Sequence, residues 1–183
     1  RVADVIAAET AVVASAITGW RTPARSPGRF TVHGAWATYI GVFVALTVVE
    51  TPLVHVVLVA AGATTAAWIA SALSIYGALW LVGDLHALRH GGVMVTTEWV
   101  DVRVGIRWRA RIPRASIARV ERGRAPDGAC DLSILGAEVV LELTEPVAVR
   151  GLFGRRRDAC VLAVSADDPD GLVAAIAAPP LPE

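Results

Sequence analysis

The chain has 183 residues, of which 55% are hydrophobic and 19% are charged, and its formal net charge at pH 7 is zero. Average soluble domains are about 45–50% apolar and about 25% charged, so this composition favours a membrane protein over a soluble one. A net charge of zero gives no global basic field, so the sequence predicts no nucleic-acid partner.

The N-terminal flank, residues 1–34, predicts a short amphipathic helix followed by a basic linker. The stretch ADVIAAETAVVASAI favours a helix from about Ala3 to Ile17. Asp4 and Glu9 make it a poor transmembrane candidate, and it lacks the charged-then-apolar order of a signal peptide. We expect this helix to lie on the inner membrane surface or to pack on the C-terminal domain. The linker WRTPARSPGRF suits the lipid headgroup zone.

The next segment, residues 35–90, predicts two transmembrane helices. From Ala35 to Leu88 the only formally charged residues are Glu50 and Asp84. About 20 apolar residues cross the hydrocarbon core, so this stretch is too long for one span. The sequence Ala-Gly-Ala-Thr that follows residue 60 offers a helix end at Gly and a helix start at Thr. We therefore expect helices near Trp36–Ala61 and Thr65–Leu88.

An alternative break lies earlier in the same segment. The first helix would end at Val49, and the second would start with Thr51 as its N-cap and Pro52 at its first position. This division leaves a second segment of more than about 30 residues, longer than one span needs. The break at Gly62 is therefore favoured.

The arginines predict the orientation of the hairpin. Arginines flank both outer ends of the two helices, while the turn between them carries no basic residue. The positive-inside rule then places both termini in the cytoplasm of a multi-pass protein of the plasma membrane. The arginines concerned are Arg21, Arg25 and Arg29 before the first helix and Arg89, Arg103 and Arg107 after the second.

Polar residues interrupt the predicted spans. Counting from the turn at 1.5 Å per residue puts Glu50 near the bilayer middle, with Ser74 at the same depth, and pairs His55 with Ser71 nearer the outer surface. Pro52 predicts a kink. One interpretation is an ion or proton site, or a buried contact with a partner protein. The other is a neutral Glu50 hydrogen-bonded within the chain. Two helices are too few to enclose a pore.

The end of the second helix carries the residues that come nearest to a metal-binding pattern. His86 and His90 in GDLHALRH are four residues apart, a spacing that zinc ligands use on a helix. No third ligand of helical spacing accompanies them, and histidines near a helix C-terminus interact favourably with its dipole. The sequence therefore predicts no cofactor and no metal. If a metal ion were bound, His86 and His90 would be the candidate ligands.

From residue 91 the pattern changes to the alternation typical of strands. In VDVRVGIRWRARI the even positions 100–112 are apolar, whereas the odd positions, apart from Gly105, are charged. A run of this length is long for one strand. A three-residue loop at Gly105–Arg107 would pair residue 104 with 108, 102 with 110 and 100 with 112, and would place Asp101 opposite Arg111. We therefore predict a hairpin with this register, with Trp108 in the core and Arg109 outside it.

Further strands and a closing helix complete the predicted domain, residues 91–178, before a short tail, residues 179–183. SADDPDGLVAAIAA predicts a helix from about Pro169 to Ala177. Besides the hairpin, the strands are expected at Val93–Thr96, Ile117–Arg122, Glu138–Leu143, Val147–Arg150 and Ala159–Val164.

This arrangement resembles a bacterial pleckstrin-homology-like (PH-like) domain. The residues that carry the resemblance are the strand–turn–strand start in GVMVTTEWVDVRVGIRWRARI, the Ile112-Pro113 bend before SIARV, and the ending DDPDGLVAAI. The whole chain is similar to two-span membrane proteins of high-GC bacteria that carry such a domain. The resemblance implies an α+β membrane protein, in which a transmembrane hairpin precedes a small β-sandwich or barrel with a C-terminal helix. It also implies a domain that binds partners.

The basic residues of this domain do not follow the pattern that some eukaryotic relatives use for phosphoinositides. The first hairpin turn, Thr96-Thr97-Glu98-Trp99, is acidic rather than basic. Arginines gather elsewhere and predict either attraction to an anionic inner leaflet or an ordinary solvated strand face. They are Arg103, Arg107, Arg109, Arg111, Arg155, Arg156 and Arg157.

The sequence contains no nucleophile elbow, no Walker A loop and no HExxH motif. We therefore expect a non-enzymatic, membrane-anchored interaction module, whose partners are the bilayer and another membrane or cytoplasmic protein. One alternative is an accessory subunit of a membrane transporter or envelope-assembly complex. Another is a small ion- or metal-handling membrane protein.

Overall fold

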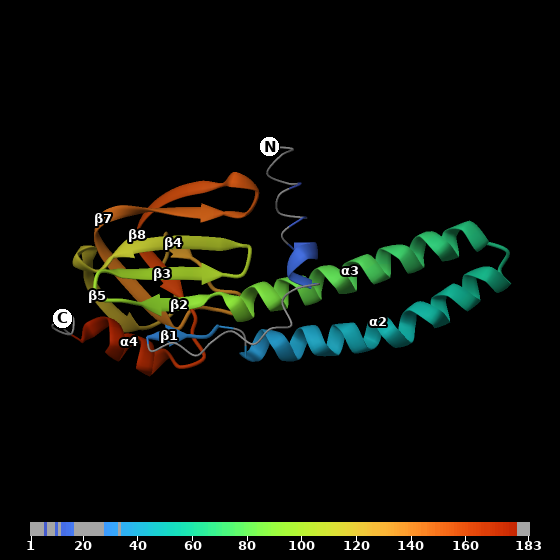
Figure 1. The fold of residues 1–183 in the computed structure, drawn as a ribbon, viewed down its shortest axis with the longest axis horizontal. Coiled ribbons are helices and arrows are strands. Elements are labelled where there is room, and N and C mark those ends of the chain that lie inside the picture. Colours follow the sequence, from blue (N-terminus) through green and yellow to red (C-terminus); the bar gives the residue numbers. More distant parts are fainter. Residues whose placement is uncertain (1–5, 7–9, 11, 17–27, 33, 179–183) are drawn as a thin grey trace.

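The structure is a computed structural model that describes residues 6, 10, 12–16, 28–32 and 34–178. Two long helices lie side by side and lead into a mixed β-sheet with a C-terminal helix, so the fold is α+β (Figure 1). The described residues of the predicted N-terminal helix are helical. Most of the predicted linker and the predicted tail at residues 179–183 lie outside the described residues.

The two long helices are α2, Gly34–Ala60, and α3, Thr64–His90. The break lies where the sequence predicts it, because Gly62 adopts a φ of +80° that favours glycine. Pro52 lies inside α2 rather than at the start of a helix, so the alternative break is wrong. Figure 1 shows α2 curving toward α3 in the half that contains Pro52, as expected where a helix loses one backbone N–H.

Both helices are long and apolar enough to cross a membrane. Their most apolar windows are 0% and 11% buried within the chain, whereas the core helix of a soluble protein would be mostly buried. Large apolar side chains such as Val48, Val49 and Leu73 are instead exposed along the hairpin. An exposed apolar surface of this kind is typical of a membrane or protein interaction site.

Among the residues that the structure describes, the sheet has eight strands in the order β1-β2-β3-β4-β7-β8-β6, and β5 pairs with β7 off this path. It is mixed because β6 runs parallel to β8, while the other pairs are antiparallel. The strands are β1 Arg29–Phe30, β2 Gly92–Val95, β3 Trp99–Val104, β4 Trp108–Pro113, β5 Ile117–Arg122, β6 Cys130–Asp131, β7 Val139–Gly151 and β8 Arg156–Val164.

The β3–β4 hairpin confirms the predicted register. Val104 pairs with Trp108, Val102 with Ala110, Val100 with Ile112, and Asp101 with Arg111. A three-residue connection leaves the apolar residues at even positions 100–112 of the two strands on one face, so the alternation in the sequence determines the register. Residue Gly105 has a φ of +54°, which explains why a glycine begins the loop.

Three features of the sheet differ from the sequence prediction. The segments predicted at Glu138–Leu143 and Val147–Arg150 form one strand, β7, with an irregularity between Glu142 and Val147. This irregularity lets one half of β7 pair with β5 and the other half with β4. The strands β1 and β6 were not predicted, because each has only two residues and so carries no alternation.

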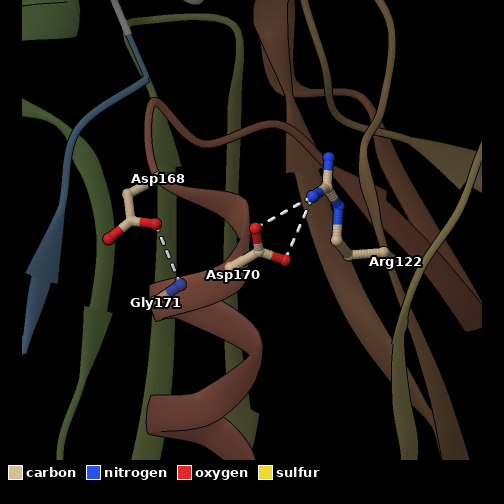
Figure 2. Close-up of polar contacts among 4 residues, drawn as sticks. All are labelled: Arg122, Asp168, Asp170 and Gly171. Atoms are coloured by element: carbon tan, nitrogen blue, oxygen red, sulfur yellow. Dashed lines mark hydrogen bonds and ion pairs between the residues drawn. The ribbon is translucent and has the colours of Figure 1, made fainter.

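The C-terminal helix α4 spans Pro169–Ala177, as predicted. The Gly171 N–H donates to Asp168 Oδ1 at 2.9 Å, which caps the first turn, and Arg122 on β5 donates to both carboxylate oxygens of Asp170 (Figure 2). Leu172 and Ile176 of α4 pack into the same buried cluster as the inward residues of the sheet. An ion pair and apolar packing therefore fix the helix to the sheet.

Candidate functional site

The end of α3 is built into the sheet domain. Leu88 is fully buried and belongs to the same apolar core as the strands. A Cβ added at Gly91 would lie 2.5 Å from the carbonyl oxygen of Arg103, so the chain leaves α3 in direct contact with β3. A Cβ added at Gly105 would lie 3.1 Å from Leu88 Cγ. The long helix and the β3–β4 hairpin therefore form one packed unit.

A buried ionic cluster lies at this junction. Asp84 on α3 is 0% exposed, and Arg107 in the β3–β4 loop donates from Nη2 to Asp84 Oδ2 at 2.7 Å. Trp36 on α2 donates from Nε1 to the same oxygen at 3.1 Å. The guanidinium carbon of Arg107 also lies 5.1 Å from the centroid of the Trp36 ring. One carboxylate therefore joins α2, α3 and the sheet.

The sequence did not predict this cluster. In the sequence Asp84 is one of the two charged residues between Ala35 and Leu88, and Arg107 is among the arginines predicted to form a basic surface. The structure instead puts Arg107 against Asp84, with only 25% of its side chain exposed. Within the described residues, Asp84 Oδ1 is buried without a hydrogen-bond partner. A buried carboxylate so placed depends heavily on its one cationic partner.

The described residues of the N-terminal helix pack across α3 next to this cluster. Val12 is fully buried, and a Cβ added at Gly83 would lie 2.3 Å from the carbonyl oxygen of Val12. His86 is 2% exposed, and its Nδ1 donates to the carbonyl oxygen of Ser15 at 3.1 Å. The contact of this helix is thus with α3.

The two histidines that the sequence offers as metal ligands, His86 and His90, lie in different environments. His86 is buried against the N-terminal helix, whereas His90 is exposed at the end of α3. In the part of the chain that the structure describes, no group of three or more His, Cys, Asp or Glu side chains is placed to hold a metal ion.

One of the two pairs of polar residues expected in the helix hairpin is in contact, namely His55 and Ser71. His55 Nδ1 and Ser71 Oγ are 2.8 Å apart in a hydrogen bond that joins α2 and α3. The His55 ring also meets Trp68 edge-on, with ring centroids 4.8 Å apart. This part of the hairpin is thereby satisfied within the chain.

Glu50 lies in a different situation. Its side chain is exposed on α2, beside a groove of about 630 Å³ that runs between the two long helices and is also lined by Ser71, Ser74 and Trp80. Among the described residues, no hydrogen bond or ion pair reaches the Glu50 carboxylate. The structure thus brings Glu50 and Ser74 to one groove without joining them.

The remaining arginines of the predicted basic surface are exposed. Arg111 stacks on Trp99, with its guanidinium carbon 4.6 Å from the ring centroid, and Arg103 pairs with Asp101 at 3.0 Å. The others are exposed on β4, in the β7–β8 turn or on β8, namely Arg109, Arg155, Arg156 and Arg157.

A second groove lies between β5 and α4 at the end of the domain remote from the long helices (Figure 1). It has a volume of about 770 Å³, and Ile117, Val120 and Ile176 contribute apolar atoms to its lining. Arg114 holds one end, because its Nη2 donates at 2.9 Å to the carbonyl oxygens of Ala175 and Ile176 and also contacts that of Ala178. A cation there satisfies carbonyls that a helix end leaves open.

The two cysteines are free and differ in environment. Cys130 is 3% exposed, and burial raises the pKa of its thiol, an effect that Arg157 partly opposes and Asp131 reinforces. A thiol with a raised pKa is a poor nucleophile, because the thiolate is the reactive form. Cys160 is exposed on β8.

Comparison with protein-family models, with curated proteins and with solved structures finds no match to this chain.

Proposed function

We propose that the chain is a non-enzymatic interaction module anchored in the plasma membrane by two spans, with both termini in the cytoplasm and a PH-like domain at the inner leaflet. The observation that carries the proposal is the junction at the end of α3, where Leu88 enters the core of the sheet and Asp84 binds Arg107. A domain on a flexible tether would not need such a junction. Here the bilayer sets the orientation of the domain.

This orientation gives each face of the domain a defined position. The β5–α4 groove lies at the end farthest from the long helices, so it faces the cytoplasm when the helices span the membrane (Figure 1). Among the described residues β5 pairs only with β7, which leaves its other edge beside the groove. An extended segment of a partner protein can add to such an edge and place side chains in the groove.

Site-specific photo-crosslinking in cells tests the proposal. A photoreactive residue at Ala118, exposed on β5 beside the groove, is compared with one at Asp127, exposed in a loop that does not line the groove. We expect Ala118 to capture one protein partner that also co-purifies stoichiometrically in mild detergent. Equal capture at both positions would contradict the groove. Purification of the chain alone, as a homo-oligomer with bound metal or with ion flux in liposomes, would contradict the module itself.

A second candidate is an accessory subunit of a transporter or envelope-assembly complex, and Glu50 favours it. An ionised carboxylate at mid-depth in a bilayer costs at least about 3 kcal/mol. Because Glu50 is exposed beside the groove between α2 and α3, a partner helix with a donor or cation would relieve this cost. Loss of a co-purifying membrane protein in Glu50→Ala, with normal insertion and with Glu50→Gln as the control, would favour this candidate. Loss of proton or cation flux instead would favour ion handling.

A further inference from the structure

Four exposed arginines form a row across four neighbouring strands. Arg103 on β3 pairs with Arg109 on β4, Arg109 pairs with Arg150 on β7, and Arg150 pairs with Arg156 on β8. Directly paired residues point to the same face of a sheet, so all four lie on its outer face. With strands about 4.8 Å apart, the row is about 14 Å long. We call these four residues the arginine row.

The arginine row is poorly neutralised by the chain itself. Arg103 has a nearby carboxylate, Asp101, and Arg156 lies 3.9 Å from Asp158. For Arg109 and Arg150, at the centre of the row, the described residues provide no ion pair and no hydrogen bond to the guanidinium. Like charges directly opposite each other destabilise a sheet, so the register itself is unfavourable without an anion.

The arginine row begins beside the C-terminal end of α3. The backbone of Arg103 contacts Gly91, the residue that follows the last residue of α3. The strands β2, β3 and β4 run in roughly the same direction as the long helices, so a row that crosses them lies roughly parallel to a bilayer that the helices span (Figure 1). All four guanidinium groups are therefore at a similar distance from the membrane surface.

The depth of the row follows from the length of α3. Its 27 residues extend about 40 Å, which exceeds the 30 Å hydrocarbon core by about 10 Å. If the helix starts at the outer surface, the last seven residues or so reach through the inner headgroup zone. The arginine row, level with the end of α3, then lies beside the phosphates of the inner leaflet.

Charges on the same face are ordered along the strands. The next level of the same face lies two residues along each strand from the arginine row, on the side away from the long helices. There Asp101 on β3 lies opposite Arg111 on β4, and Ala148 on β7 lies opposite Asp158 on β8. Two carboxylates therefore appear at this level. The face is thus most positive at the edge nearest to the proposed bilayer. A solvated strand face has no need for such an order.

We propose that the arginine row binds the phosphate groups of anionic phospholipids in the inner leaflet, through Arg103, Arg109, Arg150 and Arg156. This inference rests on the proposed placement of the domain at that leaflet. The site lies on strands and not in the acidic turn between β2 and β3, and it includes Arg150, which the sequence prediction omitted. Guanidinium groups suit this role because their donors match phosphate oxygens in pairs.

The test is a titration of the full chain, in neutral detergent, with phosphatidylglycerol, and separately with phosphatidylcholine. Bound lipid is counted by native mass spectrometry. The variant Arg109→Gln/Arg150→Gln is compared with Arg119→Gln/Arg124→Gln, which removes two exposed arginines from β5 and the loop after it. Each arginine near an anionic surface contributes about 1 kcal/mol, a factor of about five, so the row variant should bind phosphatidylglycerol about 25-fold more weakly than wild type. The control should stay within about twofold.

Two further readouts keep the outcomes separate. Without anionic lipid, the row variant should be at least as thermally stable as wild type, because a repulsion has been removed. Unchanged affinity of the folded row variant for phosphatidylglycerol would overturn the lipid site. Equal affinity for inorganic phosphate would show a soluble anion as the ligand and overturn the commitment to lipid. Labelling of Cys160 by an impermeant reagent in intact cells would instead overturn the placement of the domain, and with it the proposed function.

Discussion

Replacing Arg107 by Met should destabilise the protein more than replacing Asp84 by Asn, although both changes remove the same ion pair. In Arg107→Met the carboxylate of Asp84 stays buried, at 0% exposure, with one neutral hydrogen bond from Trp36. Breaking a buried pair in this way costs about 3–5 kcal/mol. The Arg107 side chain is 25% exposed, so some water reaches the site, and we expect about 3 kcal/mol.

In Asp84→Asn the amide oxygen still accepts the Trp36 hydrogen bond, and the partly exposed guanidinium of Arg107 turns toward water. The loss is then about 1.5 kcal/mol, as for a hydrogen bond to a charged group. The double variant contains no buried charge and should lose about 2 kcal/mol rather than the sum of about 4.5, a coupling of about 2.5 kcal/mol between the two sites.

The assay is equilibrium unfolding of the purified chain in mixed micelles, followed by circular dichroism, with Arg111→Met as the matched control. Arg111 is exposed and stacks on Trp99, so its replacement should cost no more than about 1 kcal/mol. Should Arg107→Met cost less than Asp84→Asn, or no more than Arg111→Met, the β3–β4 loop is not docked on a buried carboxylate.

Three other changes test separate parts of the structure. Trp108→Ala should lower the free energy of unfolding by about 2 kcal/mol or more, because the ring packs against the core. Arg109 is exposed, so Arg109→Ala should cost less than about 0.5 kcal/mol. The reverse order of the two costs would mean that the register of the hairpin is wrong. Gly83→Leu should release the N-terminal helix, because even a Cβ there meets a backbone carbonyl at 2.3 Å, so limited proteolysis of the N-terminal segment should accelerate; unchanged cleavage would argue against this contact. Iodoacetamide should modify exposed Cys160 in the folded chain and Cys130 only on unfolding. Equal alkylation rates of Cys130 and Cys160 at neutral pH would contradict the burial of Cys130. Burial also raises the pKa of the Cys130 thiol, so the contribution of this thiol to the free energy of unfolding is full below the ordinary thiol pKa and declines as pH rises toward the folded value.

Local patterns in the sequence predict much of the fold. Alternation between apolar and charged residues determines the register of the β3–β4 hairpin, since a slip by one residue would turn Val102 outward and Arg103 inward. Glycine at residue 62 and aspartate at residue 168 set helix ends through conformations that depend only on nearby residues. The bounds of α4 and β5 agree with the prediction because both depend on local sequence patterns.

The parts that sequence reasoning missed depend on contacts between distant segments. Asp84 and Arg107 are 23 residues apart, and nothing local distinguishes Arg107 from the arginines that remain exposed. A signal was present, because an isolated Asp near the end of an apolar helix needs a cationic partner. Arg150 joined the row only through its pairing with β4 and β8, which no single segment of sequence encodes.

The most direct test of the account is thiol labelling with a membrane-impermeant maleimide in intact cells. Cys160 is exposed on the sheet domain, and Ala63→Cys introduces a thiol beside the turn between α2 and α3. If the two helices span the membrane with the domain at the inner leaflet, the thiol introduced by Ala63→Cys reacts in intact cells. Cys160 then reacts only after permeabilisation. Labelling of Cys160 in intact cells, or protection of the Ala63→Cys thiol until permeabilisation, would contradict the account.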